Sequence, residues 1–149
     1  TKDIKYSMLS SIFRTPGYWK TEKELHQKAL DLLAIFHLDD KADYLAASLP
    51  YGEQRKLEIA RALATDMKIL LLDEPAAGMN PTETADLLRC IKVIRERFGV
   101  AILLIEHDMS LVMNVCERIQ VINFGETIAA GLPDEIANNP EVIEAYLGK

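Results

Sequence analysis

The stretch that decides the fold is Ile69-Leu70-Leu71-Leu72-Asp73-Glu74-Pro75, in which four aliphatic residues are followed at once by two acids. A short, continuous apolar run of this kind is typical of a strand that is buried on both faces of a parallel sheet. The run Val100–Ile105 predicts a second buried strand. A helical pattern separates the two runs, so the order of elements indicates an α/β domain with a parallel sheet.

Further elements are expected on both sides of these strands. A turn at 15–17 precedes a helix that opens with a capping box, Thr21 and Glu24. The strand 119–124 should turn at Gly125 into a hairpin. The remaining expected elements are a helix over 55–64, a helix from Asn80-Pro81-Thr82-Glu83 to about Arg97 with Gly99 closing it, a helix over 109–115 and two short C-terminal helices.

Composition sets outer limits on the function. The chain has 149 residues, 49% of them hydrophobic, and a net charge of −6. A chain of this size can bury about two-thirds of its unfolded surface, which is enough for a core. An acidic balance gives no general attraction to nucleic acid, and no apolar run approaches the roughly 18 residues that a spanning helix needs. Cys90 and Cys116 are interpreted as buried thiols in a reducing cytoplasm.

Polar residues that end the two buried strands are the first candidates for chemistry, because ligands of open α/β sheets collect at the carboxyl ends of strands. Asp73 and Glu74 end the first strand, and Glu106-His107-Asp108 end the second. One carboxylate of such a pair can hold Mg²⁺ while the other polarises a water for attack on phosphorus, and a histidine can contact the phosphoryl group. Taken singly, each set is also compatible with a purely structural strand end.

A glycine at a helix start is a third candidate. Tyr51-Gly52-Glu53-Gln54 precedes a strongly helical stretch. Unpaired backbone N–H groups and the helix dipole make such a place suited to an anion. The alternative is a plain N-terminal turn.

These residues occur in an order that resembles the ATP-binding cassette (ABC) ATPases, a branch of the P-loop NTPases. Leu49–Glu53 with the helix that follows resembles the family's signature motif, and Leu70–Pro75 resembles its Walker B strand. Ala76–Pro81 resembles the D-loop, and His107 resembles the switch histidine. Four motifs in the family's order and spacing form a highly specific match.

The resemblance implies a role for each matching residue. Asp73 would hold Mg²⁺ through water, Glu74 would be the general base, and His107 would contact the γ-phosphate of ATP. In the family two ATPase subunits pair head to tail, and each ATP lies between the phosphate loop of one and the signature motif of the other. The ATP-contacting residues implied here are Leu49, Pro50, Tyr51, Gly52, Glu53, Gln54 and Asn80.

Two positions depart from the usual motifs. Asn80 stands where the D-loop usually has Asp, which keeps a polar group and removes a charge. Pro50 stands where the signature usually has Ser, and proline brings neither a hydroxyl nor an N–H. Backbone donors from Tyr51 onward would then carry more of the phosphate contact. We interpret the change at Pro50 as a feature of a subfamily; the change at Asn80 leaves its role across the dimer open.

A narrower resemblance links the chain to the ATP-binding subunits of branched-chain amino acid importers. It rests on residues 72–81, 104–109, 139–148 and the segment around 15–19. It implies a peripheral subunit at the cytoplasmic face of the cell membrane. Its partners would be a second ATPase subunit, identical or paralogous, transmembrane permease subunits and, indirectly, a substrate-binding protein, with no nucleic acid.

No glycine of the chain begins the phosphate-loop pattern G-x-x-x-x-G-K-[ST], and the one Gly-Lys pair is Gly148-Lys149. We therefore expect residues 1–66 to be a helical subdomain that ends in the signature helix, and 67–149 to be the C-terminal part of the core. The fold is then incomplete because the phosphate-loop strand is absent, and the chain alone should not bind ATP tightly.

Two other functions are alternatives to the importer ATPase. They are a non-catalytic regulatory module and an exporter-type or DNA-repair cassette.

Overall fold

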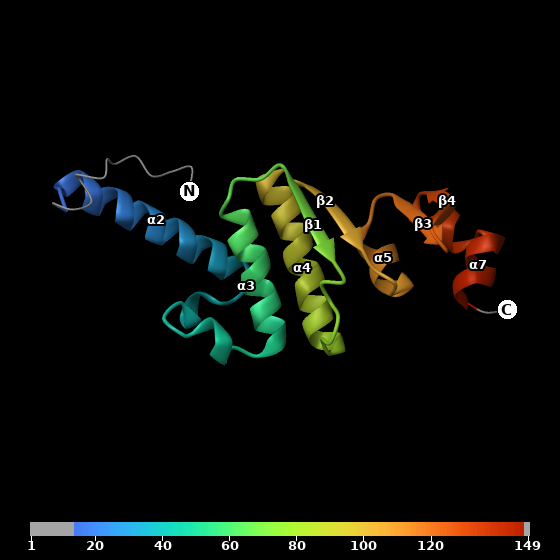
Figure 1. Ribbon diagram of the computed structural model, residues 1–149, viewed down its shortest axis with the longest axis horizontal. Coiled ribbons are helices and arrows are strands. Elements are labelled where there is room, and N and C mark those ends of the chain that lie inside the picture. The colour runs from blue at the N-terminus through green and yellow to red at the C-terminus, as the bar shows by residue number, and fades with distance from the viewer. Residues whose placement is uncertain (1–13, 148–149) are drawn as a thin grey trace. The chain divides into compact units, whose positions relative to one another are not determined.

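A computed structural model describes residues 14–147 of the chain (Figure 1). These residues form two compact units, and each is described by itself. The first contains the described residues up to Leu70 together with Ala76–Leu103, and the second contains Leu71–Pro75 and the described residues from Leu104 onward. The boundary between the units passes through both strands of one small sheet.

The first long helix, α2 (Pro16–Ile35), begins earlier than the sequence predicts. Pro16 occupies the first turn, where its fixed φ suits a helix and its missing N–H costs nothing. The predicted turn at 15–17 and the capping role of Thr21 are therefore wrong. The Thr21 hydroxyl lies inside the helix and donates to the carbonyl of Gly17 at 3.1 Å.

Two short 3₁₀ turns, η1 (Asp39–Lys41) and η2 (Ala46–Ser48), connect α2 to α3 (Tyr51–Leu63). Helix α3 buries one face, and Pro50 occupies its N-cap position without a side-chain cap. The buried residues of α3 are Gly52, Lys56, Ile59, Ala60 and Leu63. The signature segment thus ends in a helix that is anchored along its length.

Helix α4 (Pro81–Phe98) has the predicted N-terminus. Asn80 Oδ1 accepts the backbone N–H groups of Thr82 and Glu83, each at 3.0 Å, and Glu83 Oε2 accepts the N–H of Asn80 at 2.9 Å. This reciprocal arrangement is a capping box. Gly99 ends the helix with φ of 60°, a left-handed conformation that glycine adopts without steric cost.

Strands β1 (Ile69–Asp73) and β2 (Ala101–Ile105) pair in a two-stranded sheet. The N–H of Ala101 donates to Lys68 O at 3.0 Å near one end, and the N–H of Glu74 donates to Ile105 O at 2.9 Å near the other. The strands therefore run parallel, as predicted, and the carboxyl ends of both meet at one edge. Figure 1 shows the two arrows side by side with the same direction.

The prediction that both strands are buried on two faces is wrong. Leu70 and Leu72 are buried, whereas Ile69 and Leu71 are 59% and 66% exposed. Leu103 and Ile105 of β2 are also more than half exposed. Their apolar run predicts two-sided burial, but no element among the described residues covers this face.

The second unit contains α5 (Met109–Val115) and an antiparallel hairpin of β3 (Ile119–Asn123) and β4 (Glu126–Gly131). Phe124 and Gly125 link the strands with φ values of 47° and 85°. Positive φ at both positions is the mark of the type I′ turn, whose twist matches a hairpin. The predicted hairpin is confirmed, and within residues 14–147 β3 pairs with β4 alone.

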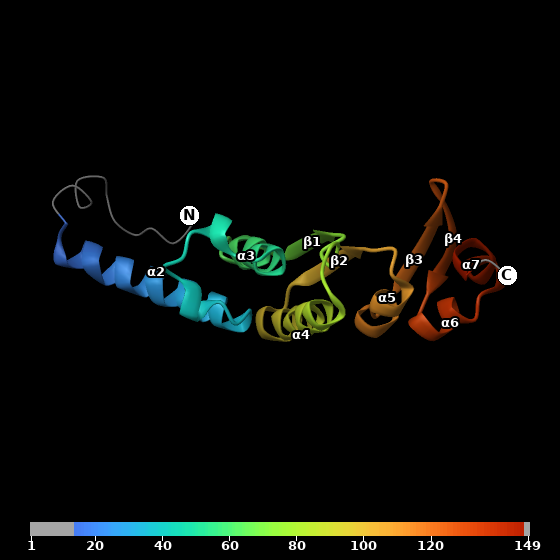
Figure 2. The same cartoon turned by 90° about the horizontal axis from the view of Figure 1, so that it is seen from below.

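Helices α6 (Pro133–Ala137) and α7 (Pro140–Leu147) complete this unit, as the sequence predicts (Figure 2). Its core is a cluster of Ile119, Val121, Ile136 and Val142. The strands, α6 and α7 each contribute to that cluster. The hairpin and the C-terminal helices therefore stabilise one another.

The two cysteines are both free thiols, and they differ in burial. Cys90 on α4 is buried and lies 3.3 Å from the carbonyl of Ile35. Cys116 is only half-buried, so its prediction as a buried thiol holds in part. Burial is the main cause that raises the pKa of both thiols above the ordinary value.

An ion pair joins α3 to α4. The Lys56 ammonium, on a residue only 8% exposed, contacts Asp86 Oδ2, and Arg89 contacts the other oxygen at 3.0 Å. The hydrogen bond from Lys56 is the largest cause that holds the pKa of Asp86 below its ordinary value. Removal of the Asp86 carboxylate would leave the Lys56 ammonium buried without this partner.

We predict that Asp86→Asn destabilises the chain at pH 7 and that the loss shrinks below about pH 4. A carboxyl whose folded pKa is depressed contributes stability above its unfolded pKa, and that contribution disappears as pH falls through the folded pKa. Urea unfolding at a series of pH values measures this. The control Asp31→Asn, at an exposed residue of α2, should keep the parent's profile; equal profiles for the two variants would contradict the prediction.

Candidate functional site

The carboxyl ends of β1 and β2 bring Glu74 and His107 together. Glu74 Oε1 lies 3.1 Å from His107 Nδ1, a hydrogen-bond distance between residues 33 positions apart. Both side chains are solvent-accessible, with 51% and 73% of their surface exposed. A carboxylate and an imidazole are thus held in contact at an edge that a ligand can reach.

The backbone of Glu74 helps to aim its side chain. Glu74 has φ of 42°, in the left-handed region that residues other than glycine seldom adopt. Its N–H donates to Ile105 O at 2.9 Å, so the conformation is fixed by the end of the sheet. Strain at a functional position persists where the surrounding structure over-determines it.

A second carboxylate lies close to His107. The side chain of Glu106 is only 3% exposed, and its Oε2 is 3.9 Å from His107 Nδ1. His107 Nδ1 therefore has one exposed and one buried carboxylate within 4 Å. The family motifs alone do not identify Glu106 as a site residue, and its one sequence signal is its place between the strand and the histidine.

Asp73 is exposed at the end of β1. Residues 14–147 contain no group of three or more His, Cys, Asp or Glu arranged to hold a metal. Mg²⁺, however, is usually held by one or two carboxylates together with water and substrate phosphates. The oxygen donors of Asp73 and Glu74 fit a metal of that kind when it arrives with a nucleotide.

The signature segment presents backbone donors. Pro50 is the N-cap of α3, and its carbonyl accepts the N–H groups of Glu53 and Gln54 at 3.0 Å. The Gln54 amide donates to Leu49 O at 2.8 Å and fixes the loop before the helix. No side chain caps this N-terminus. The first-turn amides of Tyr51 and Gly52 are the ones that helix geometry leaves available to an anion.

The side-chain contacts of Glu53 do not suit the binding of an anion. Its Oε1 accepts from the Lys41 ammonium, and its Oε2 is buried without a hydrogen-bond partner among the described residues. The hydrogen bond from Lys41 to Glu53 is the main cause that raises the pKa of the lysine. Glu53 thus links the signature helix to the η1 turn.

Asn80 is exposed, and its Oδ1 accepts both N–H groups of the α4 cap. Its side-chain oxygen is therefore occupied by the helix cap.

The predicted site residues are divided between the two units. Asp73, Glu74 and His107 belong to the second unit, whereas Leu49–Gln54 and Asn80 belong to the first.

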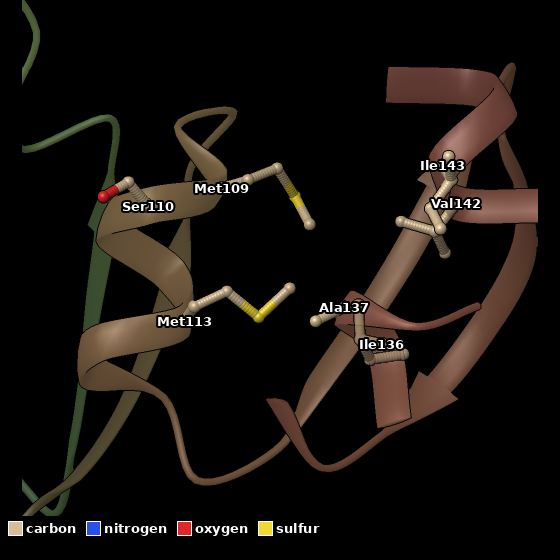
Figure 3. Close-up of a pocket in the computed structure, with 7 residues that line it drawn as sticks. All are labelled: Met109, Ser110, Met113, Ile136, Ala137, Val142 and Ile143. Atoms are coloured by element: carbon tan, nitrogen blue, oxygen red, sulfur yellow. The ribbon is translucent and has the colours of Figure 1, made fainter. Parts of the chain in front are cut away.

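A cavity of about 200 Å³ lies elsewhere in the second unit, between α5 and the C-terminal helices (Figure 3). Figure 3 shows the side chains of Met109 and Met113 on one side and Ile136, Ala137, Val142 and Ile143 on the other. Ser110 is the one residue of its lining with a polar side chain. A lining of this kind does not suit a phosphate, so the cavity adds nothing to the polar site.

No helix among the described residues has the length and the apolar character needed to cross a bilayer.

Two family models match the chain. One, described as ABC transporter, matches residues 4–77, and the other, described as branched-chain amino acid ATP-binding cassette transporter, matches residues 126–149. The two matches cover the signature segment, β1 and the C-terminal helices. They therefore involve both compact units.

Curated relatives match over nearly the whole chain. BraF of Pseudomonas aeruginosa and LivG of Escherichia coli K12, both named as high-affinity branched-chain amino acid transport ATP-binding proteins, are 45% identical over 148 residues. The match covers 99% of this chain and 58% of each relative. The chain thus spans less than two-thirds of the length of these relatives.

Solved structures support the same assignment. The ADP conformation of MJ1267, an ATP-binding cassette of an ABC transporter, has a TM-score of 0.76 and 30% identity, over 98% of this chain and 58% of that one. CbiO1 of Clostridium perfringens, part of the transporter complex cbiONQ, has a TM-score of 0.74 and 27% identity over 83% of this chain and 49% of that one. With its motifs in order on the same fold, the chain belongs to the family of ABC ATP-binding subunits.

Proposed function

We propose that this chain is part of an ATPase that energises an importer of branched-chain amino acids. In that ATPase the chain supplies the hydrolytic carboxylate, the switch histidine and a signature motif. The observation that carries the proposal is the contact of Glu74 Oε1 with His107 Nδ1 at 3.1 Å. Glu74 and His107 lie side by side at the carboxyl ends of two strands. They are a base for water and an imidazole that can contact phosphate, two groups that phosphoryl transfer to water uses.

Each residue of that edge has a part in the chemistry. Glu74 accepts a hydrogen bond from the attacking water and orients it toward the γ-phosphate. The His107 imidazole, held through Nδ1, offers Nε2 to the phosphoryl oxygens. Asp73 would hold a hydrated Mg²⁺, which would supply positive charge against the phosphates.

The signature segment acts on a different nucleotide. In a head-to-tail pair, Gly52 and its neighbours donate backbone N–H groups to the γ-phosphate held by the other ATPase subunit. Pro50 cannot donate, so Tyr51 and Gly52 are the first available donors of α3. Asn80 approaches the same interface with its amide group.

The match of residues 126–149 to the branched-chain amino acid cassette model supports the choice of transported substrate, as do the names of the BraF and LivG relatives. The partners are then a second ATPase subunit, transmembrane permease subunits and, through them, a substrate-binding protein. The place of action is the cytoplasmic face of the membrane, with the helical subdomain of residues 1–66 toward the permease.

A second candidate function is a regulatory module without hydrolysis. The proline at position 50 favours it, because it removes a hydroxyl and an N–H from the signature motif. Asp73, Glu74 and His107 oppose it, because a module without hydrolysis has no need of them.

We predict that Glu74→Gln lowers steady-state ATP turnover by about 100-fold or more, since the amide cannot act as a base. The assay uses the assembled ATPase that contains this chain, for which BraF with its matching region exchanged for this chain provides a host. The matched control is Glu126→Gln, at an exposed carboxylate of β4. Turnover retained in Glu74→Gln would contradict the role of Glu74 as the base, and a parent assembly without turnover would favour the regulatory module.

We also predict that the 149-residue chain alone binds ATP with Mg²⁺ no more tightly than about 1 mM in a calorimetric titration. The physical reason is that a phosphate loop supplies most of the donors that surround the phosphates. The host relative BraF serves as the positive control. A submillimolar site on the isolated chain would contradict this prediction.

A further inference from the structure

The signature segment, residues 49–54, and the D-loop, residues 76–81, contact each other within the first unit. Gly52 is buried against the side chain of Glu83: a Cβ placed on Gly52 would lie 3.0 Å from Glu83 Oε1 and 3.2 Å from its Cδ. Any larger residue at position 52 would displace this carboxylate. The glycine therefore permits a close approach of α3 to the start of α4.

The same carboxylate holds the D-loop. Its second oxygen, Oε2, accepts the backbone N–H of Asn80 at 2.9 Å, and Asn80 is the last D-loop residue before Pro81. One side chain thus fills the space beside the signature glycine that a Cβ would enter, and it binds the D-loop backbone through Oε2. The capping box accounts for the hydrogen bond to Asn80, but it does not account for the approach to Gly52.

A second contact joins the same two segments. Gly78 has φ of 75°, and a Cβ there would lie 3.3 Å from Cε1 of the Tyr51 ring. The ring is held in place by Arg55, whose Nε donates to the Tyr51 hydroxyl at 3.0 Å. Further along the helices, the Lys56–Asp86 ion pair keeps α3 beside α4.

We propose that Glu83 is a positioning residue that ties the signature segment to the D-loop, so that the two move as one body. This inference rests on the proposed function, in which Gly52 and Asn80 both face nucleotide sites of the paired ATPase. A displacement of the signature by one ATP then displaces the D-loop. Coupling of this kind is reciprocal, because a shared body transmits a change in either direction.

The chain contains a matched control for this residue. Glu135 occupies the third position of α6, its Oε2 accepts the N–H of Leu132 at 2.8 Å, and its side chain lies against Gly131. Glu83 and Glu135 each accept the backbone N–H of the N-cap residue three positions earlier, and each lies against a glycine. Only Glu83 contacts the signature segment.

The first test measures the contact without ATP. In the 149-residue chain, Glu83→Ala should speed amide hydrogen exchange at Glu53 and Gln54 by about tenfold, whereas Glu135→Ala should leave it within about twofold of the parent. Glu83→Gln keeps an oxygen acceptor and should stay near the parent. Equal exchange in Glu83→Ala and Glu135→Ala would overturn the proposal.

The second test measures ATP turnover in the assembled ATPase. Glu83→Ala should lower kcat about tenfold with little change in the KM for ATP, since the tie acts after the nucleotide is held. Glu135→Ala should stay near the parent, and Glu83→Gln should restore turnover. A rise in KM alone, or equal losses in both alanine variants, would overturn the proposal. A parent without turnover would contradict the proposed function, and the exchange measurement would still decide the role of Glu83.

Discussion

The backbone hydrogen bond from the N–H of Glu74 to Ile105 O is the constraint on which the site depends. It closes the parallel ladder at the point where both strands end, and it holds Glu74 at a positive φ. His107 is two residues after Ile105. The same bond therefore brings the Glu74 carboxylate and the His107 imidazole to a distance of 3.1 Å. The relative position of Glu74 and His107 therefore follows from the register of the two strands. The residues between positions 74 and 107 return the chain to the same end of the sheet.

Much of the architecture could be predicted from the sequence, because its signals are local. The capping box at Asn80 and Glu83, the parallel strands and the turn at Gly125 each depend on a few adjacent residues, and each is present. The pairing of Glu74 with His107 follows from one rule about strand ends. Family motifs then narrow the chemistry that such a pair performs.

What the sequence could not reveal depends on contacts between distant segments. The start of α2 was misplaced because Thr21 and Glu24 satisfy a local capping pattern, whereas Pro16 sets the real first turn. Glu83 is predicted as part of a helix start, and only the fold places its side chain beside Gly52. Glu106 is a strand-end candidate in the sequence, and only the fold shows that its side chain is 3% exposed.

The uncovered aliphatic face of β1 and β2 has a thermodynamic consequence. Apolar surface gains about 25 cal/mol for each Å² removed from water, and the exposed side chains Ile69, Leu71, Leu103 and Ile105 form such a surface. Any layer that covers them associates mainly through the release of water, and the robust calorimetric sign of that event is a decrease in heat capacity. An association through these side chains should therefore strengthen with warming near room temperature, unlike one that rests on polar contacts.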